Sequence, residues 1–220
     1  MEHIKQALAN LSTGIGIPAP MISGESEESQ EDRLEQIRKS LNVSSLSHTF
    51  ENFRMLKGTA DSYKLFRELS LPDTEWRMLL CYGGVGNGKT HLLEALSIAL
   101  YKQGRKARIV TMSEIMRNLR KAMDKTNPLT PEVVLDRYCT AERLLIDDVG
   151  MGGSGSDWEW GQFEEIIVAR YQARLLTAVT TNLDLKKLHD DYPRIVSRFR
   201  DPEIGRIVLN EGIDYRARKA

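Results

Sequence analysis

The stretch Gly83-Gly84-Val85-Gly86-Asn87-Gly88-Lys89-Thr90 fits the pattern G-x-x-x-x-G-K-[ST], which is typical of loops that bind phosphate groups. The apolar run Met78-Leu79-Leu80-Cys81-Tyr82 precedes this stretch, and the helical pattern His91-Leu92-Leu93-Glu94-Ala95-Leu96 follows it. A strand, a glycine-rich loop and a helix in this order form the context that such a loop requires. An ordinary glycine-rich turn before Lys-Thr is the alternative, but the flanking patterns favour a nucleotide-binding site.

The residue types of this loop explain how it would bind phosphates. Glycines let the backbone turn tightly, and successive N–H groups then point at phosphate oxygens. The helix that starts near Gly88 adds its positive end, Lys89 would reach the outer phosphates, and the Thr90 hydroxyl would contact Mg²⁺. The predicted nucleotide-binding residues are Gly83, Gly84, Val85, Gly86, Asn87, Gly88, Lys89, Thr90 and His91.

The composition bounds the class of protein. The chain has 220 residues and a formal net charge of +0, so we expect one core and no overall field that attracts nucleic acid or membranes. Cys81 and Cys139 adjoin apolar runs and form no CxxC pair, which indicates core residues in a reducing compartment and argues against a zinc module. With neither a signal peptide nor a bilayer-spanning run, a cytoplasmic protein without a membrane partner is expected.

Residues 1–47 differ from the rest of the chain and predict a short N-terminal arm with an acidic linker. Acidic residues dominate positions 24–35, which is typical of a solvated linker, and Leu34, Ile37 and Leu41 recur at the spacing of a weak helix. A disordered tail and a docking arm for a partner are both compatible with this composition. Residues 48–220 form the predicted globular domain.

Strand-like and helical patterns alternate along the globular part. Apolar runs occur at 78–82, 107–111, 143–146, 175–180 and 207–209, and helical patterns near 90–102, 113–124, 131–139, 157–173 and 184–199. Such alternation predicts an α/β fold in which a parallel five-stranded sheet lies between helices. Ligands of such sheets bind at the carboxyl ends of the strands, where the glycine-rich loop is also found.

Two further strand ends carry polar residues that suit nucleotide hydrolysis. Asp147 and Asp148 follow Leu144-Leu145-Ile146, so Asp147 could hold Mg²⁺ beside the Thr90 hydroxyl while Asp148 orients and deprotonates a water. Ordinary turn chemistry is the alternative for an Asp-Asp pair before glycine. Asn182 follows the run 175–181 and could contact that water or the γ-phosphate, although a turn or helix-cap role would also explain it.

Two groups of basic residues outside the glycine-rich loop could contact phosphate groups. Arg194 and Arg198 share one face of a predicted helix, where an arginine could stabilise charge on a phosphoryl group bound by a neighbouring subunit. An ordinary basic helix face is the alternative. Four basic residues lie mainly off the apolar stripe of their helix and form either a solvated face or a basic stripe that could follow phosphates: Arg117, Arg120, Lys121 and Lys125.

These pieces together resemble the helicase-loader and transposition-helper branch of the AAA+ ATPases, the DnaC, DnaI and IstB-like group. The resemblance runs from about Thr49 to Arg216. The matching motifs are Thr49–Phe53, Gly83–Thr90 with His91-Leu92, Leu144–Gly150, Arg170-Tyr171, Thr180–Leu183, Ser197-Arg198-Phe199 and Gly212–Arg216. Their order and spacing are far more specific than any one of them.

The resemblance implies roles, cofactors and partners. It implies an ATPase with ATP and Mg²⁺ as cofactors, Asn182 as the sensor of the γ-phosphate, and Arg198, with Arg194 as a second candidate, as the arginine supplied to a neighbouring subunit. It also implies self-association through the ATP site, single-stranded DNA in a channel, and a DnaB-type replicative helicase as the partner that this protein loads during DNA replication. An IstB-like regulator of a transposase and a nucleotide-gated adaptor with little turnover are the alternatives.

Three features of the sequence qualify the resemblance. Asp148 stands where many AAA+ proteins have Glu, and its shorter side chain sets the carboxylate further back. The chain ends soon after the last predicted strand, so we expect no C-terminal lid domain. The run Gly150-Met151-Gly152-Gly153-Ser154-Gly155-Ser156 is rich in glycine and predicts a mobile loop near the ATP site or a subunit interface.

Overall fold

The protein is built around one parallel sheet of five strands in the order β2-β3-β4-β1-β5. The computed structural model describes residues 27–150, 156–212 and 214–215. The strands are β1 (Met78–Tyr82), β2 (Ile109–Thr111), β3 (Arg143–Val149), β4 (Leu176–Thr181) and β5 (Gly205–Leu209). The predicted α/β fold with five parallel strands is therefore confirmed.

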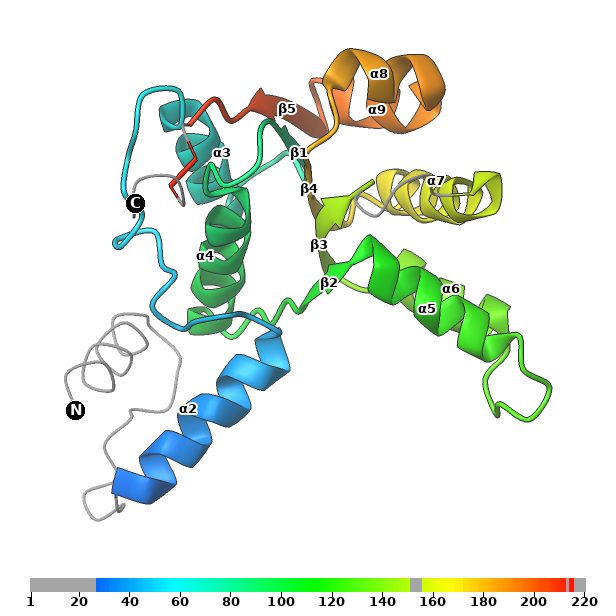
Figure 1. Ribbon diagram of the computed structural model, residues 1–220, viewed down its shortest axis with the longest axis horizontal. Coiled ribbons are helices and arrows are strands. Elements are labelled where there is room, and N and C mark those ends of the chain that lie inside the picture. The colour runs from blue at the N-terminus through cyan, green and yellow to red at the C-terminus, as the bar shows by residue number, and fades with distance from the viewer. Residues whose placement is uncertain (1–26, 151–155, 213, 216–220) are drawn as a thin grey trace.

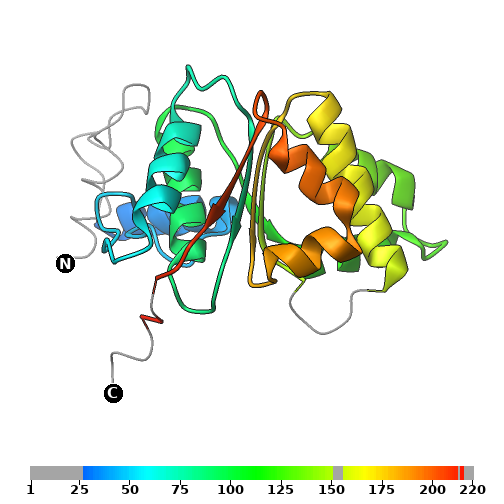
Figure 2. The ribbon, with the colours of Figure 1, turned by 90° about the horizontal axis from the view of Figure 1, so that it is seen from above.

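Helices cover both faces of this sheet, as Figures 1 and 2 show from two directions. One face carries α3 (Ala60–Ser70) and α4 (Lys89–Lys102), and α2 (Glu27–Leu41) lies beside α4. The other face carries α5 (Met112–Ala122), α6 (Pro131–Thr140), α7 (Asp157–Gln172), α8 (Leu185–Asp191) and α9 (Pro193–Arg200).

The alternation of side chains along β1 explains how one strand serves two cores. Leu79 and Cys81 belong to the apolar cluster on the α3–α4 side, whereas Met78 and Leu80 belong to the cluster on the α7–α9 side. All four are buried, because helices cover both faces of a parallel sheet and such strands read as continuous apolar runs. β1 lies between β4 and β5, which places the loop that follows it at the carboxyl edge of the sheet, next to the end of β4.

The segment before residue 48 differs from its predicted form. The structure has a helix from Glu27 to Leu41 where the acidic composition predicts a linker up to residue 35. Leu34 and Leu41 are buried in the same cluster as α3 and α4, and the Asn42 side-chain amide donates to the Ile109 carbonyl oxygen at 2.8 Å. Acidic residues lie on the outer face of this helix while its apolar stripe packs inward. The acidic composition of the segment alone therefore does not predict this packing. The domain division at residue 47 stays a proposal.

Two other helices depart from the predicted pattern. The helix predicted over 184–199 is two helices, α8 and α9, because Pro193 lacks an N–H donor and forces the residue before it out of the helical conformation. Tyr192 accordingly has φ −135° and ψ 63°. The helix α3 has no counterpart among the predicted helices, although Phe66 and Leu69 form its buried stripe.

Some predictions fall outside the described residues. These are the first half of the N-terminal arm, the glycine-rich run over 151–155, and Ile213 and Arg216 of the last family motif. Within the described parts of the chain, no helix has the length and apolar character needed to cross a membrane.

Candidate functional site

The glycine-rich loop joins β1 to α4 at the carboxyl edge of the sheet. Gly83 has φ 143° and Gly88 has φ 93°, a backbone region that other residues rarely adopt. A Cβ at Gly83 would collide with the Asn210 carbonyl oxygen, and one at Gly88 would lie 2.9 Å from the Phe53 ring. Glycine is therefore required at both positions by backbone conformation and by close packing.

Lys89 is held at the centre of this loop. Its Nζ donates to the Gly83 and Gly84 carbonyl oxygens at 3.0 and 2.6 Å, and to Asn87 Oδ1 at 3.1 Å. It also donates to Asn182 Oδ1 at 2.7 Å, which links the loop to the end of β4. Burial lowers the pKa of Lys89, and an anionic ligand at this point would favour its charged form.

Asp147 lies next to the first turn of α4, at the end of β3. The Thr90 hydroxyl donates to Asp147 Oδ2 at 2.9 Å, and the Thr180 hydroxyl donates to the other carboxylate oxygen. Asp147 is buried, and burial raises its pKa despite these two hydrogen bonds. A cation at this position would restore the stability of the ionised carboxylate.

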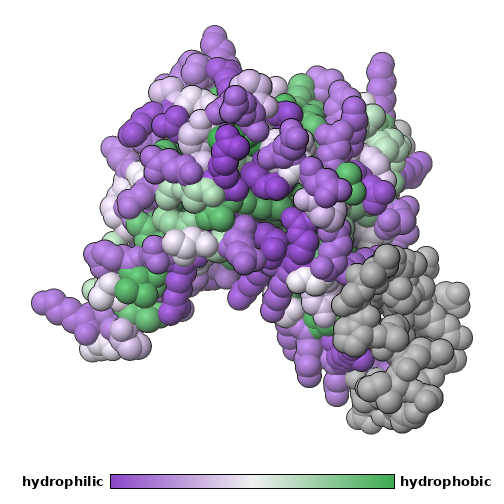
Figure 3. All heavy atoms as spheres, turned by 180° about the vertical axis from the view of Figure 1, so that it is seen from behind, coloured by the Kyte–Doolittle hydropathy of each residue, from purple (hydrophilic) through white to green (hydrophobic). Residues whose placement is uncertain are grey.

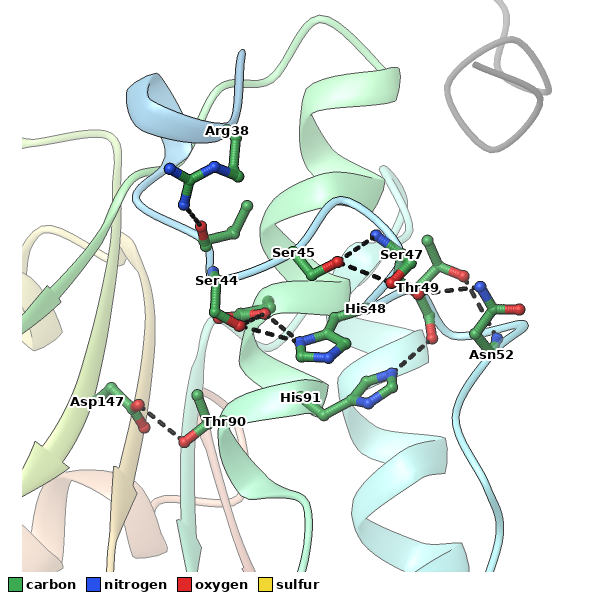
Figure 4. Close-up of polar contacts among 12 residues, drawn as sticks. Arg38, Ser44, Ser45, Ser47, His48, Thr49, Asn52, Thr90, His91 and Asp147 are labelled. Atoms are coloured by element: carbon green, nitrogen blue, oxygen red, sulfur yellow. Dashed lines mark hydrogen bonds and ion pairs between the residues drawn. The ribbon is translucent and has the colours of Figure 1, made fainter. Parts of the chain in front are cut away.

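The residues around Asp147 fit Mg²⁺. The Thr90 hydroxyl and the Asp147 carboxylate are hard oxygen donors side by side, and Figure 4 shows them pointing toward each other. The described residues hold no group of three His, Cys, Asp or Glu that could bind a metal. Mg²⁺ usually takes one or two protein oxygens and completes its shell with phosphate oxygens and water.

Asp148 occupies an irregular point of β3. The register with β4 shifts between Ile146 and Val149, and Asp148 has φ 54°, the left-handed region that costs a non-glycine residue on the order of 1–3 kcal/mol. Its N–H donates to the Thr180 hydroxyl at 3.2 Å. Consecutive side chains of a strand point in different directions, and here Asp147 is buried whereas Asp148 is exposed.

Asn182 connects the two charged groups of the site. Its Nδ2 donates to Asp148 Oδ1 at 3.2 Å, while its Oδ1 accepts from Lys89. The amide therefore lies between the phosphate loop and the exposed carboxylate. The three strand ends that the sequence singled out are brought together as predicted, while the catalytic and metal-binding roles of these residues stay predictions.

These residues border a cavity of about 580 Å³. One wall consists of the loop from Val85 to His91, together with Asp148 and Asn182. A second wall comes from the segment between α2 and α3 and from Tyr215; its residues are Ser44, His48, Asn52, Phe53, Arg54 and Tyr215. The volume is within the range of sites for small molecules of nucleotide size.

An aromatic cluster anchors the second wall to α4. The His48 and His91 rings stack with centroids 4.6 Å apart, and the Phe53 ring meets His91 edge-on at 5.2 Å. His91 Nε2 also lies 3.0 Å from the Thr49 carbonyl oxygen. Behind them, Glu94 is buried with its carboxylate 2.5 Å from His48 Nδ1. Figure 4 shows the polar contacts of His48 and His91, which join this segment to α4.

Glu94 is ionised in this setting. Burial opposes the charge, but hydrogen bonds from His48 and from the Ser44 backbone and hydroxyl outweigh it and hold the pKa of Glu94 below its ordinary value. The sequence singled out Thr49–Phe53, and Tyr215 within Gly212–Arg216, by family likeness alone, and it gave no signal for Ser44 or Glu94. Their contribution depends on tertiary contacts over 46 or more positions, such as the His48–Glu94 pair.

The two predicted arginines lie elsewhere. Arg194 and Arg198 are on α9 and do not border the cavity described above. Arg194 pairs with Glu164 at 2.7 Å, and the Arg198 guanidinium lies over the Tyr171 ring at 4.8 Å from its centroid. Within one subunit they are not brought to the other site residues, so a role in hydrolysis requires a neighbouring subunit.

Comparisons with known proteins agree with this geometry. The sequence model of the family described as the bacterial DnaA ATPase domain matches residues 45–192. The chromosomal replication initiator protein DnaA of Nautilia profundicola is 32% identical over 162 residues, which are 73% of this chain and 35% of that protein. The replicative helicase loader DnaC of Buchnera aphidicola subsp. Baizongia pistaciae is 30% identical over 106 residues, 48% of this chain and 43% of the loader. The chain thus spans less than half the length of these relatives.

Solved structures show the same fold. Two structures of DnaA bound to AMPPCP, one from Aquifex aeolicus and one that also holds single-stranded DNA, match with a TM-score of 0.64 and 26% identity, over 75% of this chain and 50% of theirs. A DnaC helicase loader structure matches with a TM-score of 0.61 over 75% of this chain and 97% of the loader, at 20% identity that supports the fold alone.

The relatives are divided between initiators and loaders, so the expected likeness to the loader branch holds only for the wider group. The family match nevertheless extends over most of the chain and includes the phosphate loop, both aspartates and Asn182. The chain belongs to the family of the bacterial DnaA ATPase domain, and so to the AAA+ ATPases of the DnaA and DnaC group.

Proposed function

We propose that this protein is an ATP-dependent loader that places a hexameric DnaB-type replicative helicase onto single-stranded DNA during DNA replication. The observation that carries the ATPase part is the joined set of contacts at one cavity. Lys89 bonds to Asn182, Asn182 bonds to Asp148, and Thr90 bonds to Asp147. In this proposal Lys89 would supply a fixed positive charge, Asp148 a general base, and Thr90 with Asp147 a cation site, around one position for a phosphoryl group.

The proposed reaction is the attack of water on the γ-phosphorus of ATP, which breaks the bond to ADP and releases phosphate. Asp148 would take the proton of the water, since its carboxylate is exposed, and Asn182 would hold that water or the γ-phosphate. Mg²⁺, when bound, would neutralise charge on the phosphates. The short side chain of Asp148 predicts slow hydrolysis that rises with DNA or a partner.

The arginines of α9 support a site shared between subunits. Arg198 is held over the Tyr171 ring, and the Tyr171 hydroxyl donates to Asp201 Oδ2 at 2.5 Å. Such packing would present the guanidinium in one orientation to the nucleotide of a neighbouring subunit. Arg194 is exposed and paired with Glu164, which makes it the second candidate for this role.

The end of α5 is the proposed contact for single-stranded DNA. Arg117, Lys121 and Lys125 are exposed there, and a surface hollow runs from Arg117 to Pro128. This end projects from the body of the molecule in Figure 1, and hydrophilic side chains cover most of the face seen in Figure 3. The match to a DnaA structure that holds single-stranded DNA supports the assignment.

An initiator-type role is the second candidate. The family model that matches residues 45–192 is that of DnaA, and a DnaA relative covers 73% of this chain. The loader proposal depends instead on relatives described as replicative helicase loaders and on the order of the motifs from Thr49 onward. The two roles predict different partners, because a helicase loader would bind a helicase whereas a chromosomal replication initiator would act on the DNA where replication starts.

Capture of partners with Mg·ATP tests these roles. Purified protein should retain the replicative helicase of its own genome, and Lys89→Ala should abolish ATP turnover and the ATP dependence of that retention. Loading of the helicase onto a single-stranded circle is the functional readout. Retention of a transposase would support an IstB-like role, and binding to origin DNA without helicase would support the initiator role. Helicase retention with ATP but without phosphate release would indicate a nucleotide-gated adaptor.

A further inference from the structure

Asn210 follows β5 directly and contacts the phosphate loop from outside the motif. Its side-chain Nδ2 donates to the Asn87 carbonyl oxygen at 2.8 Å, and the Asn87 side-chain amide donates back to the Asn210 carbonyl oxygen. Its own N–H donates to the Tyr82 carbonyl oxygen at 2.8 Å, at the last residue of β1. The two asparagines are therefore joined in both directions, across 123 positions of sequence.

The remaining polar atom of Asn210 is also satisfied. The Ser62 hydroxyl of α3 donates to Asn210 Oδ1 at 2.5 Å. Ser62 and Asn210 are fully buried, and Asn87 is 1% exposed, so water does not replace these bonds when they are lost. Asn87 in turn accepts from Lys89 Nζ at 3.1 Å, which continues the chain of bonds to the group that would meet the phosphates.

We propose that Asn210 is a positioning residue of the nucleotide site: by fixing Asn87, it sets where the Lys89 ammonium stands relative to the outer phosphates. The inference depends on the proposed ATP binding of this chain. Asn210 does not border the cavity, so it acts through Asn87 and Lys89 and does not touch the nucleotide.

The close packing at Gly83 is why a displacement of Asn210 would reach the loop. A Cβ at Gly83 would collide with the Asn210 carbonyl oxygen, so no gap separates the two backbones. Gly83 is also one of the carbonyl acceptors of Lys89 Nζ, at 3.0 Å. A shift of Asn210 therefore moves two of the oxygens that hold the ammonium, one on Gly83 and one on Asn87.

The test compares the affinities of variants for ATP and for adenosine at a temperature where all remain folded. Asn210→Ala should raise the Kd for Mg·ATP about tenfold, which corresponds to about 1.4 kcal/mol. It should leave the Kd for adenosine within about twofold, because adenosine has no phosphate for Lys89 to contact. Equal losses for both ligands would mean that the cavity as a whole has loosened, and would overturn the positioning role.

Thr177→Val is the matched control, since Thr177 is also fully buried and bonded but lies at the far end of β4, beside Arg170. It should lower thermal stability without changing either Kd. In a double-mutant cycle with Asn87→Ala, the two losses in ATP affinity should be clearly less than additive, because both act through the same contact. Full additivity would overturn the inference.

Ser62→Ala is the second variant if Asn210→Ala fails to fold. It removes the bond to Asn210 Oδ1 and one to the Thr59 carbonyl oxygen, which keeps the Tyr63 N–H as a donor. Its Kd for ATP should rise about two- to fivefold, equivalent to somewhat under 1 kcal/mol. An unchanged Kd would overturn the proposal. If the wild-type protein bound no ATP, the proposed function would fail; if the wild type bound and the Asn210 and Ser62 variants bound equally well, only the positioning role would fail.

Discussion

Replacing Arg170 with methionine should lower the free energy of unfolding by about 3–5 kcal/mol. Arg170 is fully buried, and its guanidinium donates to the Thr177 hydroxyl at 2.9 Å and to the Leu176 carbonyl oxygen at 2.7 Å. It also donates to the carbonyl oxygens of Tyr138 at 2.8 Å and Ala141 at 2.7 Å, at the C-terminal end of α6. A single side chain thus joins α7, β4 and the end of α6.

The magnitude follows from the acceptors that the substitution leaves behind. Carbonyl groups in the last turn of a helix have no intrahelical partner, so Tyr138 and Ala141 depend on Arg170. Each buried acceptor left without a donor costs about 1–3 kcal/mol. Removing a cation whose pKa burial has lowered to about 10 returns part of that cost. A net loss of about 3–5 kcal/mol is what the two opposing effects leave.

Urea denaturation followed by circular dichroism measures this loss. Arg170→Lys should recover only part of the stability, because one lysine ammonium cannot bond at once to all the acceptors that surround the planar guanidinium. Arg137→Met is the control, since Arg137 is exposed on α6 and its loss should cost at most about 0.5 kcal/mol. A loss below about 1 kcal/mol for Arg170→Met would refute the reasoning, because it would mean that water or repacking satisfies the four acceptors.

Three other substitutions test separate parts of the structure. Gly88→Ala should weaken ATP binding measured by calorimetry, because φ 93° disfavours a Cβ. Gly161→Ala, in the open middle of α7, should instead raise the free energy of unfolding by about 1 kcal/mol. If the two substitutions changed ATP affinity and stability alike, the argument from φ would be contradicted. Glu94→Gln should cost about 1–3 kcal/mol at neutral pH. Because the pKa of Glu94 is lower in the folded state, its contribution to stability is present above the pKa of the unfolded state and is lost as the pH falls through the pKa of the folded state. The denaturation curves of wild type and variant should therefore converge in acid. Arg198→Ala should bind ATP without hydrolysing it, and mixing it with Lys89→Ala should restore phosphate release; no recovery would contradict a shared site.

The strands and the phosphate loop were predictable because their signals are local. A continuous apolar run such as Met78–Tyr82 predicts a strand that is buried on both faces. The glycine positions of the loop indicate a backbone conformation that other residues rarely adopt. The break between α8 and α9 was also readable, since Pro193 ends any helix that precedes it. The helical patterns on both sides of it obscured this stop signal.

The second wall of the cavity could not be predicted, because its residues acquire their roles from distant partners. His48 reads as an unremarkable polar residue until α4 brings Glu94 within 2.5 Å of it. Asn210 follows the last strand as an ordinary loop residue, and only the parallel pairing of β1 with β5 places it beside Asn87. For α2 the acidic composition wrongly predicted a linker, because the acidic residues lie on the outer face while Leu34 and Leu41 are buried.

The two walls of the cavity belong to different parts of the chain, so a nucleotide that contacts both could affect residues outside the site. The first wall is the loop between β1 and α4, whereas most of the second wall is the segment from Ser44 to Arg54, which follows the end of α2. A ligand that contacts both walls stabilises their joined arrangement by RT ln(1 + [L]/Kd), about 2.7 kcal/mol at a hundredfold excess over Kd. Part of that free energy should reach α2, because Leu34 and Leu41 of α2 lie in the same buried cluster as the apolar residues of α4. ATP binding should therefore slow amide exchange in α2 as well as in the loop, and unchanged exchange in α2 would contradict this coupling.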